Sequence, residues 1–398
     1  MSEQSFPDPG VPVDSMDAET LKGRIDDAQD VTVLDVRAES EYETWHVDGE
    51  RVTDANVPYF EFLEGATDEL LERVPEAPDG EPIVVVCAKG QSSEFVAGLL
   101  KQEGIDAVNL ADGMNGWARL YEAAELDADT DATVLQYRRP SSGCLAYLVV
   151  SDGEAAVVDP LRAFADRYVE DAREYGAELR YAADTHVHAD HVSGARELAE
   201  RGVELVFPAP AAARGVEFDT EYRAVEDGDS LTVGSVEIDV LHTPGHTSGM
   251  TSYLVDDAVL LTGDTLFTES VARPDLEEGD EGAPEAAARL HETLQERILT
   301  LPEDVLVAPA HFGDAATPRE DGTYAAHLGD LDASMSVLSM DRDEFVEFVR
   351  SDMPPRPANY ETIIATNLGR EEVGDNRAFE LELGPNNCAA SSDAMTSD

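Results

Sequence analysis

The chain has 398 residues, and at about 150 residues per domain this length predicts two or three domains. Its 85 acidic and 27 basic residues leave a net charge of −58, which repels phosphate backbones and anionic lipids, so we expect neither nucleic-acid nor membrane partners. Hydrophobic residues still make up 42% of the chain, which is enough for packed cores. No apolar run reaches the length of a membrane span and the first ten residues lack a signal-peptide pattern, so we expect a soluble, cytoplasmic protein.

The negative charge is accompanied by very few lysines. Only three of the 27 cations are lysines, and this combination resembles the surfaces of halophilic proteins. Molar salt shortens the Debye length to about 3 Å and screens the self-repulsion, so we expect the fold to lose stability in dilute buffer. Three widely spaced cysteines, Cys87, Cys144 and Cys388, do not form a disulfide framework. The sequence leaves the oligomeric state open, a homo-oligomer included.

The first part of the chain alternates strands with helices. The predicted elements are two buried strands, a helix and a further strand, at residues 31–36, 82–88, 92–104 and 107–110. This alternation indicates a small α/β unit with a parallel sheet over about residues 17–124, behind an N-terminal extension, 1–16. The acidic stretch 125–133 has few core residues and is predicted to be a linker.

The second part of the chain opens with hairpin signals instead. Asp152 and Gly153 separate two apolar runs, which strongly indicates a tight antiparallel hairpin, and a second hairpin is predicted over residues 251–262. Further strands are predicted at 179–184, 204–207, 231–233, 235–241 and 304–310, and helices at 164–176, 193–202, 284–299 and in the region up to about 352. This mixture indicates stacked sheets with helices outside, over residues 134–375. The polar end, 376–398, is predicted to be a frayed tail.

Cys87 lies between a predicted strand and a predicted helix. Its loop, 87-CAKGQSS-93, places the thiol beside the free amide groups of the helix N-terminus, where the positive end of the dipole favours the thiolate. Gly90 allows the backbone to curl so that several N–H groups point inward and bind an anion. Such a loop suits a persulfide on the cysteine, although a buried structural cysteine fits the residues alone equally well.

Residues that commonly bind metals follow several predicted strands. One dense cluster is 184-DTHVHADH-191, and further members follow strands downstream. Imidazole and carboxylate groups at the ends of neighbouring strands can converge on a cation, and packing alone does not explain five such histidines. The predicted metal-site residues are His186, His188, Asp190, His191, His246, Asp264 and His311.

The first unit resembles the rhodanese family. The resemblance is carried by the segment 34–50, the loop at Cys87 and the segment 109–121, in the order expected for the family. It implies an α/β domain with a parallel sheet flanked by helices. It also implies that Cys87 carries sulfane sulfur, with Asp35 and Arg37 at the mouth of the site.

The loop departs from the rhodanese pattern at one position. Ser92 stands where the family often has an arginine, so that Lys89 is the only cation of the loop. This difference leaves open a weak or specialised transferase. It also leaves open an alternative in which the domain is a non-catalytic sulfur carrier or docking module.

The second unit resembles the metallo-β-lactamase superfamily, from about Gly143 to Gly369, through the order and spacing of its seven metal-site residues. The resemblance implies an α+β fold, an αββα sandwich, in which Asp159 is structural and not a metal ligand.

The same seven metal-site positions serve two different reactions in this superfamily. Two zinc ions bridged by Asp264 generate a hydroxide that hydrolyses a thioester, as in glyoxalase II. Alternatively, one Fe(II) held by two histidines and one carboxylate leaves open positions for O₂ and a sulfur substrate.

Further residues resemble the persulfide dioxygenase branch of the superfamily. Arg273 follows Asp264 by nine positions and precedes Pro-Asp, a pattern in which the arginine supports the active site, although a plain ion pair is the alternative. The segment 354–369 resembles the C-terminal part of dioxygenase and rhodanese fusions, and the second unit lacks the lysines expected of glyoxalase II. The resemblance implies iron ligands His186, His246 and Asp264, while the other four residues shape the pocket or hold a second metal.

The sequence therefore predicts a two-domain enzyme of sulfur metabolism. It would oxygenate a low-molecular-weight thiol persulfide to sulfite with O₂ and one Fe(II) per chain, with Cys87 and Arg273 as catalytic residues. The alternative is a glyoxalase II-like thioester hydrolase with one or two Zn²⁺. Cys144 is predicted to pack at the head of a strand, and Cys388 to lie in the tail without a partner.

Overall fold

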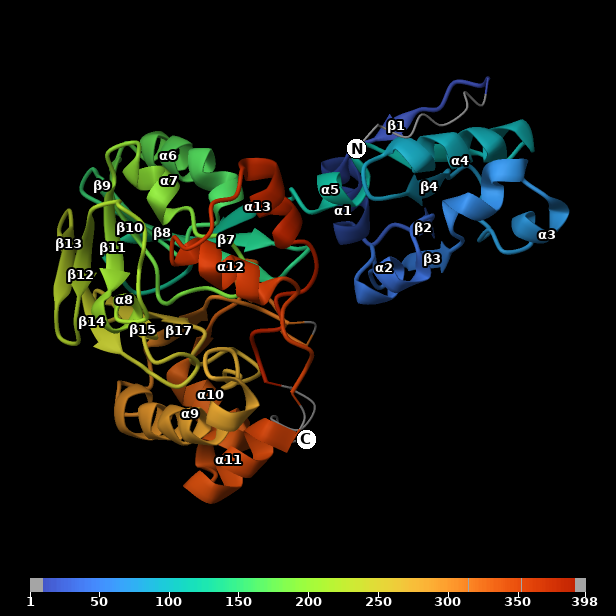
Figure 1. Cartoon of the computed structure of the whole chain (residues 1–398). Helices are drawn as coiled ribbons and strands as arrows, with labels where there is room; N and C mark the ends of the chain where they lie inside the picture. Colours follow the sequence, from blue (N-terminus) through green and yellow to red (C-terminus); the bar gives the residue numbers. More distant parts are fainter. Residues whose placement is uncertain (1–9, 314, 352, 391–398) are drawn as a thin grey trace. The chain divides into compact units, whose positions relative to one another are not determined.

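The computed structural model describes residues 10–313, 315–351 and 353–390. Backbone contacts divide the chain into two compact units, residues 1–120 and 121–398, which appear in Figure 1 as the blue to teal part and the remainder. The division falls before the predicted linker, because the chain enters the second unit's sheet already at Glu122.

The first unit is built on a parallel sheet. In the part of the chain that the structure describes, its strands lie in the order β1-β5-β4-β2-β3, and every pair is parallel. The strands are β1 (Ser15–Met16), β2 (Val31–Asp35), β3 (Val52–Asn56), β4 (Ile83–Val86) and β5 (Ala107–Leu110). The helices are α1 (Ala18–Asp26), α2 (Glu39–Thr44), α3 (Asp68–Leu71), α4 (Gln91–Gln102) and α5 (Gly113–Trp117). The predicted parallel α/β fold is confirmed.

Helices cover both faces of this sheet. On one face, α4 buries Val96 and Leu100 against the strands. On the other face, α1 and α5 bury Leu21 and Trp117. Because both faces are covered, β2 and β4 are buried along their whole length, which explains the continuous apolar sequence of β4 and the mainly apolar sequence of β2.

The second unit contains two sheets. The first has the strand order β12-β11-β10-β9-β8-β7-β6 and the second β13-β14-β15-β16-β17-β18, among the described residues. The first sheet comprises β6 (Glu122–Glu125), β7 (Thr133–Arg139), β8 (Cys144–Ser151), β9 (Glu154–Val158), β10 (Glu178–Ala183), β11 (Glu204–Pro208) and β12 (Tyr222–Val225). The second comprises β13 (Ser230–Val233), β14 (Val236–His242), β15 (Thr251–Val255), β16 (Val259–Gly263), β17 (Leu306–Pro309) and β18 (Ala326–His327).

The two sheets pack face to face, with helices on their outer faces. Val149 of β8 and Ile238 of β14 belong to one apolar cluster between the sheets. Outside the first sheet lie α6 (Ala165–Glu174) and α7 (Ala195–Ala199), and outside the second lie α9 (Gly279–Thr293), α10 (Leu328–Ser334) and α11 (Arg342–Ser351), as Figure 1 shows. The short helix α8 (Ala209–Ala212) follows β11. The predicted αββα sandwich is confirmed.

Both predicted hairpins are present. Asp152 and Gly153, with φ of 43° and 82°, join β8 to β9, as a tight turn with two left-handed residues requires. The second hairpin joins β15 to β16 through Asp256 and Asp257, which adopt φ of 51° and 55° without a glycine. Aspartate tolerates this conformation because its short side chain forms local hydrogen bonds.

The end of the chain differs from the predicted frayed tail as far as residue 390. The helices α12 (Tyr360–Asn367) and α13 (Asp375–Leu381) lead into a segment in which Glu382 and Cys388 are buried. Ala390 donates a backbone hydrogen bond to Val271. Residues 391–398 lie outside the described part of the chain. The polar composition misled the prediction because this segment buries polar groups that have partners elsewhere in the chain.

Within the described ranges, no helix has both the length and the apolar character needed to cross a membrane.

The charge imbalance gives a prediction about stability. Even if every cation paired with one carboxylate, 85 − 27 = 58 carboxylates would have no cationic partner. We expect the thermal unfolding midpoint to fall by on the order of 10 °C when KCl is lowered from about 2 M to about 0.1 M, because the Debye length lengthens from about 2 to about 10 Å. Circular dichroism at a series of salt concentrations measures this shift. A midpoint that stays constant or rises in dilute buffer would contradict it.

Candidate metal centre and thiol loop

The metal-site residues converge because their strands end at one edge of the sandwich. β14 and β16 are both antiparallel to β15, and β17 is parallel to β16, so β14, β16 and β17 end at the same edge of their sheet. His246 lies in the loop after β14, while Asp264 and His311 follow β16 and β17. The cluster 186–191 follows β10 of the facing sheet. All seven predicted residues are buried.

Three of the seven residues point unpaired atoms at one another. His186 Nε2 and His246 Nε2 lie 3.5 and 3.4 Å from Asp264 Oδ2. None of these three atoms has a hydrogen-bond partner among the described residues, and the three side chains are at most 1% exposed. Leaving three buried polar atoms unpaired is costly, and a cation held between them removes that cost. Two imidazoles and one carboxylate form a donor set that suits Fe(II) as well as zinc.

A hydrogen-bonded chain fixes the tautomer of His186. Thr185 Oγ1 donates to Asp159 Oδ2 at 2.9 Å, and it lies 2.9 Å from His186 Nδ1. Because the hydroxyl proton is directed to Asp159, the Thr185 oxygen accepts a hydrogen bond from the N–H group at His186 Nδ1. The lone pair of His186 is therefore on Nε2, which faces Asp264. Asp159 thus acts behind the site, as the sequence predicted.

His246 is held in the same tautomer by the main chain. Its Nδ1 lies 2.9 Å from the carbonyl oxygen of Arg273, which can only accept a hydrogen bond. Nδ1 therefore carries the proton and Nε2 is free to bind a cation. Hydrogen bonds of this kind orient metal ligands and raise their basicity.

The protonation states of His186, His246 and Asp264 also favour the binding of a metal cation. Burial lowers the pKa of His186 well below its ordinary value and lowers that of His246, so both imidazoles are neutral at pH 7. Burial raises the pKa of Asp264, but the charge of His311 and its hydrogen bond outweigh burial and hold the pKa below its ordinary value. Neutral imidazole and ionised carboxylate are the forms that bind metal ions.

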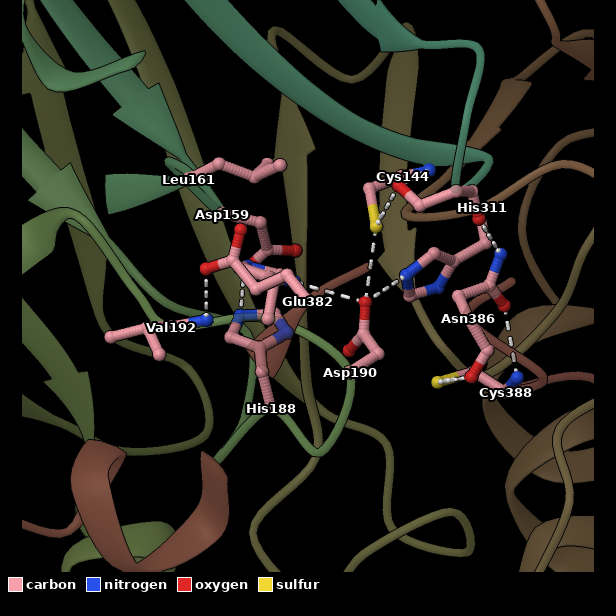
Figure 2. A network of polar contacts seen from close by, with 12 residues as sticks. Cys144, Asp159, Leu161, His188, Asp190, Val192, His311, Glu382, Asn386 and Cys388 are labelled. Atoms are coloured by element: carbon pink, nitrogen blue, oxygen red, sulfur yellow. Dashed lines mark hydrogen bonds and ion pairs between the residues drawn. The ribbon is translucent and has the colours of Figure 1, made fainter. Parts of the chain in front are cut away.

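The other residues of the set bond mainly to one another (Figure 2). Asp190 Oδ2 lies 2.8 Å from His311 Nε2 and 3.0 Å from His191 Nδ1, and it accepts the thiol proton of Cys144 at 3.1 Å. His311 Nδ1 lies 2.6 Å from Asp264 Oδ1, so the His311 ring bridges two carboxylates. Cys144, Asp190, His191 and His311 are also close enough together to hold a metal ion.

His188 takes a different position. Its Nε2 lies 3.1 Å from Asp159 Oδ1, while its Nδ1 has no hydrogen-bond partner among the described residues. His188 therefore lies beside the three-residue set of His186, His246 and Asp264, and one of its ring nitrogens contacts Asp159.

Two residues that the sequence did not reveal hold the loop of the cluster 186–191. Asn367, at the end of α12, donates to the carbonyl oxygens of His188 and His191 at 3.0 and 2.9 Å. Glu382 accepts from the backbone N–H of Val192 at 2.8 Å and pairs with Arg139 at 2.8 Å, as Figure 2 shows for Val192. Both are buried, and their only signal in the sequence is a polar residue at the end of a C-terminal helix.

The structure changes the interpretation of Cys388. It was expected in the tail without a partner, but it is fully buried, and its sulfur lies within 4.8 Å of a possible ligand atom on each of Asp264 and His311. Burial raises its pKa well above the ordinary value, so it is a neutral thiol. Cys144 heads β8 as expected and also contacts the metal-site cluster through Asp190.

The Arg273 guanidinium bonds to groups other than the three unpaired atoms. It forms a two-point ion pair with Asp275, at 2.7 and 3.0 Å, and donates to the carbonyl oxygens of Pro355 and Asn387 at 3.0 and 2.9 Å. The side chain is 1% exposed. These contacts favour a positioning role for Arg273. Its side chain binds the C-terminal segment, while its own backbone carbonyl orients His246.

This arrangement predicts the effect of removing Arg273. Arg273→Ala is expected to lower the free energy of unfolding by about 2–3 kcal/mol, because it leaves a buried carboxylate with only Arg356 as its partner, and to weaken metal binding about 10-fold. Denaturant unfolding and metal titration measure the two effects. Arg273→Lys should recover part of the stability, since lysine keeps the charge but not the planar two-point geometry.

Arg289→Ala is the matched control. Arg289 makes an exposed ion pair with Glu285, so its loss should cost less than about 1 kcal/mol. Equal effects of the two alanine variants would contradict the positioning role. A loss of turnover at Arg273→Ala with normal stability and metal content would instead make the guanidinium catalytic.

In the first unit, Cys87 lies in the loop between β4 and α4. Its thiol is 4% exposed and accepts a hydrogen bond from Gly90 N–H at 3.1 Å, and Ser93 Oγ lies at 3.1 Å. Burial raises the pKa of the thiol, but the hydrogen bonds from Ser92, Ser93 and the backbone outweigh it, so the pKa lies below its ordinary value. Gly90 has a φ of 84°, as the predicted curl of the loop requires.

The neighbouring α5 supports the back of the same loop. Met114 and Asn115 donate backbone hydrogen bonds to the carbonyls of Cys87 and Ala88 at 2.7 and 3.0 Å. Gly113 permits this approach, because a Cβ there would lie 2.0 Å from the Cys87 carbonyl oxygen. Asp35 and Arg37, predicted at the mouth of the site, form a buried two-point ion pair with each other.

Comparison with known proteins agrees with both resemblances. Residues 17–120 match the family model of the rhodanese-like domain, and residues 140–311 match that of the metallo-beta-lactamase superfamily. The human protein "Persulfide dioxygenase ETHE1, mitochondrial" is 29% identical over 54% of this chain and 78% of its own length. A hydroxyacylglutathione hydrolase from Xanthomonas campestris pv. campestris (strain B100) is 31% identical over 55% of this chain and 78% of its own.

Comparison with solved structures agrees with the metallo-β-lactamase resemblance. The crystal structure of ETHE1 from Myxococcus xanthus has a TM-score of 0.51 and 27% identity, and the match covers 60% of this chain and 98% of that one. A metallo-beta-lactamase from Staphylococcus aureus subsp. aureus COL has a TM-score of 0.55 and 26% identity, over 60% of this chain and 74% of that one. The chain therefore belongs to the metallo-β-lactamase superfamily and carries a rhodanese-like domain at residues 17–120.

Proposed function

We propose that the second unit oxygenates a low-molecular-weight thiol persulfide to sulfite, with one Fe(II) held by His186, His246 and Asp264. The observation that carries this proposal is the set of three buried, unpaired atoms on two histidines and one carboxylate. This donor set leaves several positions of an iron ion open for small molecules. The similarity to the human persulfide dioxygenase ETHE1, and to ETHE1 from Myxococcus xanthus, supports the same reaction.

The contacts of His311 favour one metal ion over two. Both of its ring nitrogens are within hydrogen-bond distance of carboxylates, and Asp190 Oδ2 contacts three neighbours. A second ion at this cluster would have to replace these contacts. Asp190 Oδ1 and His191 Nε2 of this cluster also have no hydrogen-bond partner among the described residues, but the other contacts already compensate part of its charge. The cluster therefore has less to gain from a cation than the three unpaired atoms, which have no such contacts.

The proposed reaction is R–S–SH + O₂ + H₂O → R–SH + H₂SO₃. The S–S bond breaks, the outer sulfur is oxidised to sulfite, and O₂ takes up the electrons. Bound iron would supply a position at which O₂ and the persulfide sulfur meet. The chain's own contribution is to orient the ligands through Thr185 and the Arg273 carbonyl, and to hold a proton on His311 between two carboxylates.

The rhodanese-like domain would handle sulfane sulfur on Cys87. In the exchange Cys87–S–SH + R–SH → Cys87–SH + R–S–SH, one S–S bond breaks and another forms, so the step is balanced. The hydrogen bonds to the Cys87 sulfur and its lowered pKa support thiolate as leaving group and nucleophile. The two units would then share the persulfide as substrate. The alternative remains a domain that carries sulfur or docks partners without catalysis.

A dizinc thioester hydrolase is the second candidate. The observation in its favour is the second group, Cys144, Asp190, His191 and His311, beside the first, together with hydrolase relatives that are 31% identical. In that reaction the two ions would supply hydroxide at neutral pH for the hydrolysis of an acylthiol, which needs no O₂.

Metal titration of the metal-free protein under anaerobic conditions separates the two candidates. We expect one Fe(II) per chain to bind tightly and to support O₂-dependent sulfite formation. Two tightly bound Zn²⁺ per chain, with hydrolysis of an acylthiol and no oxygenation after iron loading, would overturn the proposal.

A further inference from the structure

A cavity of about 560 Å³ adjoins the metal-site cluster at His311. Phe267 and Phe312 contribute apolar walls, and Asn386 and neighbouring residues of the C-terminal segment complete the lining. Figure 2 shows Asn386 beside His311. Because His311, which lines the cavity, contacts Asp264, one end of the cavity lies close to the proposed metal position.

The described lining of this cavity contains no lysine or arginine. All 27 cations of the chain lie within the described ranges, and none of them lines the cavity. The ring of His311 can carry a positive charge, but both its nitrogens face carboxylates, Asp190 and Asp264. The remaining charged residue of the described lining is Glu269, so away from His311 the described lining offers its occupant a carboxylate and no side-chain cation.

Glu269 is held with its carboxylate in a fixed position. It is 8% exposed, and its Oε1 accepts from the backbone N–H of Gly313 at 2.9 Å, while Oε2 accepts from Thr268 Oγ1. A carboxylate has room for about four hydrogen bonds, so about two acceptor sites remain for a ligand. Gly313 is two residues beyond His311, which places the carboxylate a short distance from the reacting end of the cavity.

We propose that this cavity selects persulfides whose thiol carries a protonated amino group, which Glu269 binds, and discriminates against those with a carboxylate in that place. This inference rests on the proposed dioxygenase function. An ammonium group gains a charge-assisted hydrogen bond from Glu269 and favourable contact with the Phe267 and Phe312 rings. A carboxylate in that place would lose its hydration beside Glu269, and the described lining offers it no lysine or arginine as a partner.

The test uses three persulfides that share a two-carbon linker and differ in the terminal group: those of cysteamine, 2-mercaptoethanol and 3-mercaptopropionate. With the iron-loaded full chain at fixed molar salt, we expect kcat/KM for O₂ uptake to fall in that order. The cationic substrate should exceed the anionic one by about 10-fold or more, a ratio typical of one buried charge-assisted contact. Calorimetry with the three parent thiols and the metal-free protein should give the same order of affinity.

Two substitutions of Glu269 test whether this residue causes the preference for the cationic substrate. Glu269→Gln should reduce the ratio between cationic and anionic substrates to about 2-fold, and Glu269→Arg should invert it. Glu347→Gln is the matched control, since it removes one exposed carboxylate on α11 that does not line the cavity, and it should keep the original ratio.

The outcomes distinguish this inference from the function on which it rests. Equal turnover of all three persulfides, or a preference that Glu269→Gln leaves unchanged, would overturn the selectivity and leave the dioxygenase in place. Failure to oxidise any of the three by protein that binds iron and remains folded would count against the dioxygenase itself. In that case the thiol affinities measured without metal still decide whether the cavity prefers the cation.

Discussion

Asp264→Ala is expected to abolish iron binding at the three-residue set and to lower persulfide-dependent O₂ uptake by on the order of 10³-fold or more. The reason is that Asp264 Oδ2 is the carboxylate oxygen of the set, and it faces the Nε2 atoms of His186 and His246 at 3.5 and 3.4 Å. This loss exceeds the 10- to 100-fold typical of removing a group that only hydrogen-bonds to a ligand. Metal analysis after anaerobic iron loading and an oxygen electrode measure the two effects.

Asp239→Ala is the matched control for this variant. Asp239 lies on β14 of the same sheet, but its side chain is exposed, so the substitution removes a carboxylate without touching the site. It should keep one iron per chain and normal turnover. Circular dichroism establishes that both variants are folded. If Asp264→Ala retained iron and turnover like Asp239→Ala, the ligand set would have to lie elsewhere.

Cys87→Ser is expected to remove the sulfane sulfur carried by the rhodanese-like domain and to reduce sulfur transfer to the background rate. A serine hydroxyl has nearly the same size, so the loop should keep its fold, but it does not form a persulfide. Oxygenation of a free persulfide should stay within about twofold, since independent sites contribute additively. Mass spectrometry after loading with a sulfur donor detects the extra sulfur atom on Cys87.

The reciprocal variant provides the control. Asp264→Ala should still load sulfur on Cys87 while it fails to oxygenate persulfide, so the two substitutions separate two activities. If Cys87→Ser left both sulfur transfer and coupled sulfite formation unchanged, the domain would be a docking module or a carrier that does not use Cys87. If both variants lost both activities equally, the two sites would not be separable.

The sequence predicted the elements that determine the site, because the relevant signals are local. Each of His246, Asp264 and His311 follows an apolar run long enough to be read as a strand, and strands that run parallel in one sheet end at the same edge. The same holds for Cys87, which directly follows the buried strand β4 and precedes α4. Local sequence patterns therefore suffice to place each of these side chains at the end of a strand.

The contacts of the C-terminal segment could not be predicted in this way. Glu382 pairs with Arg139 across 243 positions of the chain, and Asn367 holds His188 across 179. A buried polar residue with a distant partner has the same local sequence as an exposed one, so composition predicted a frayed tail where the chain folds against the site. Arg273 illustrates the same limit, because only its contacts distinguish a positioning residue from a catalytic one.

Oxygen consumption by the metal-free protein, loaded separately with Fe(II) and with Zn²⁺ and supplied with a low-molecular-weight persulfide, tests the central claim most directly. We predict that the iron-loaded protein consumes one O₂ for each sulfite formed and that the zinc-loaded protein consumes none. Iron-loaded, folded protein that consumes no O₂ with any persulfide supplied, while the zinc-loaded form hydrolyses an acylthiol, would contradict the account.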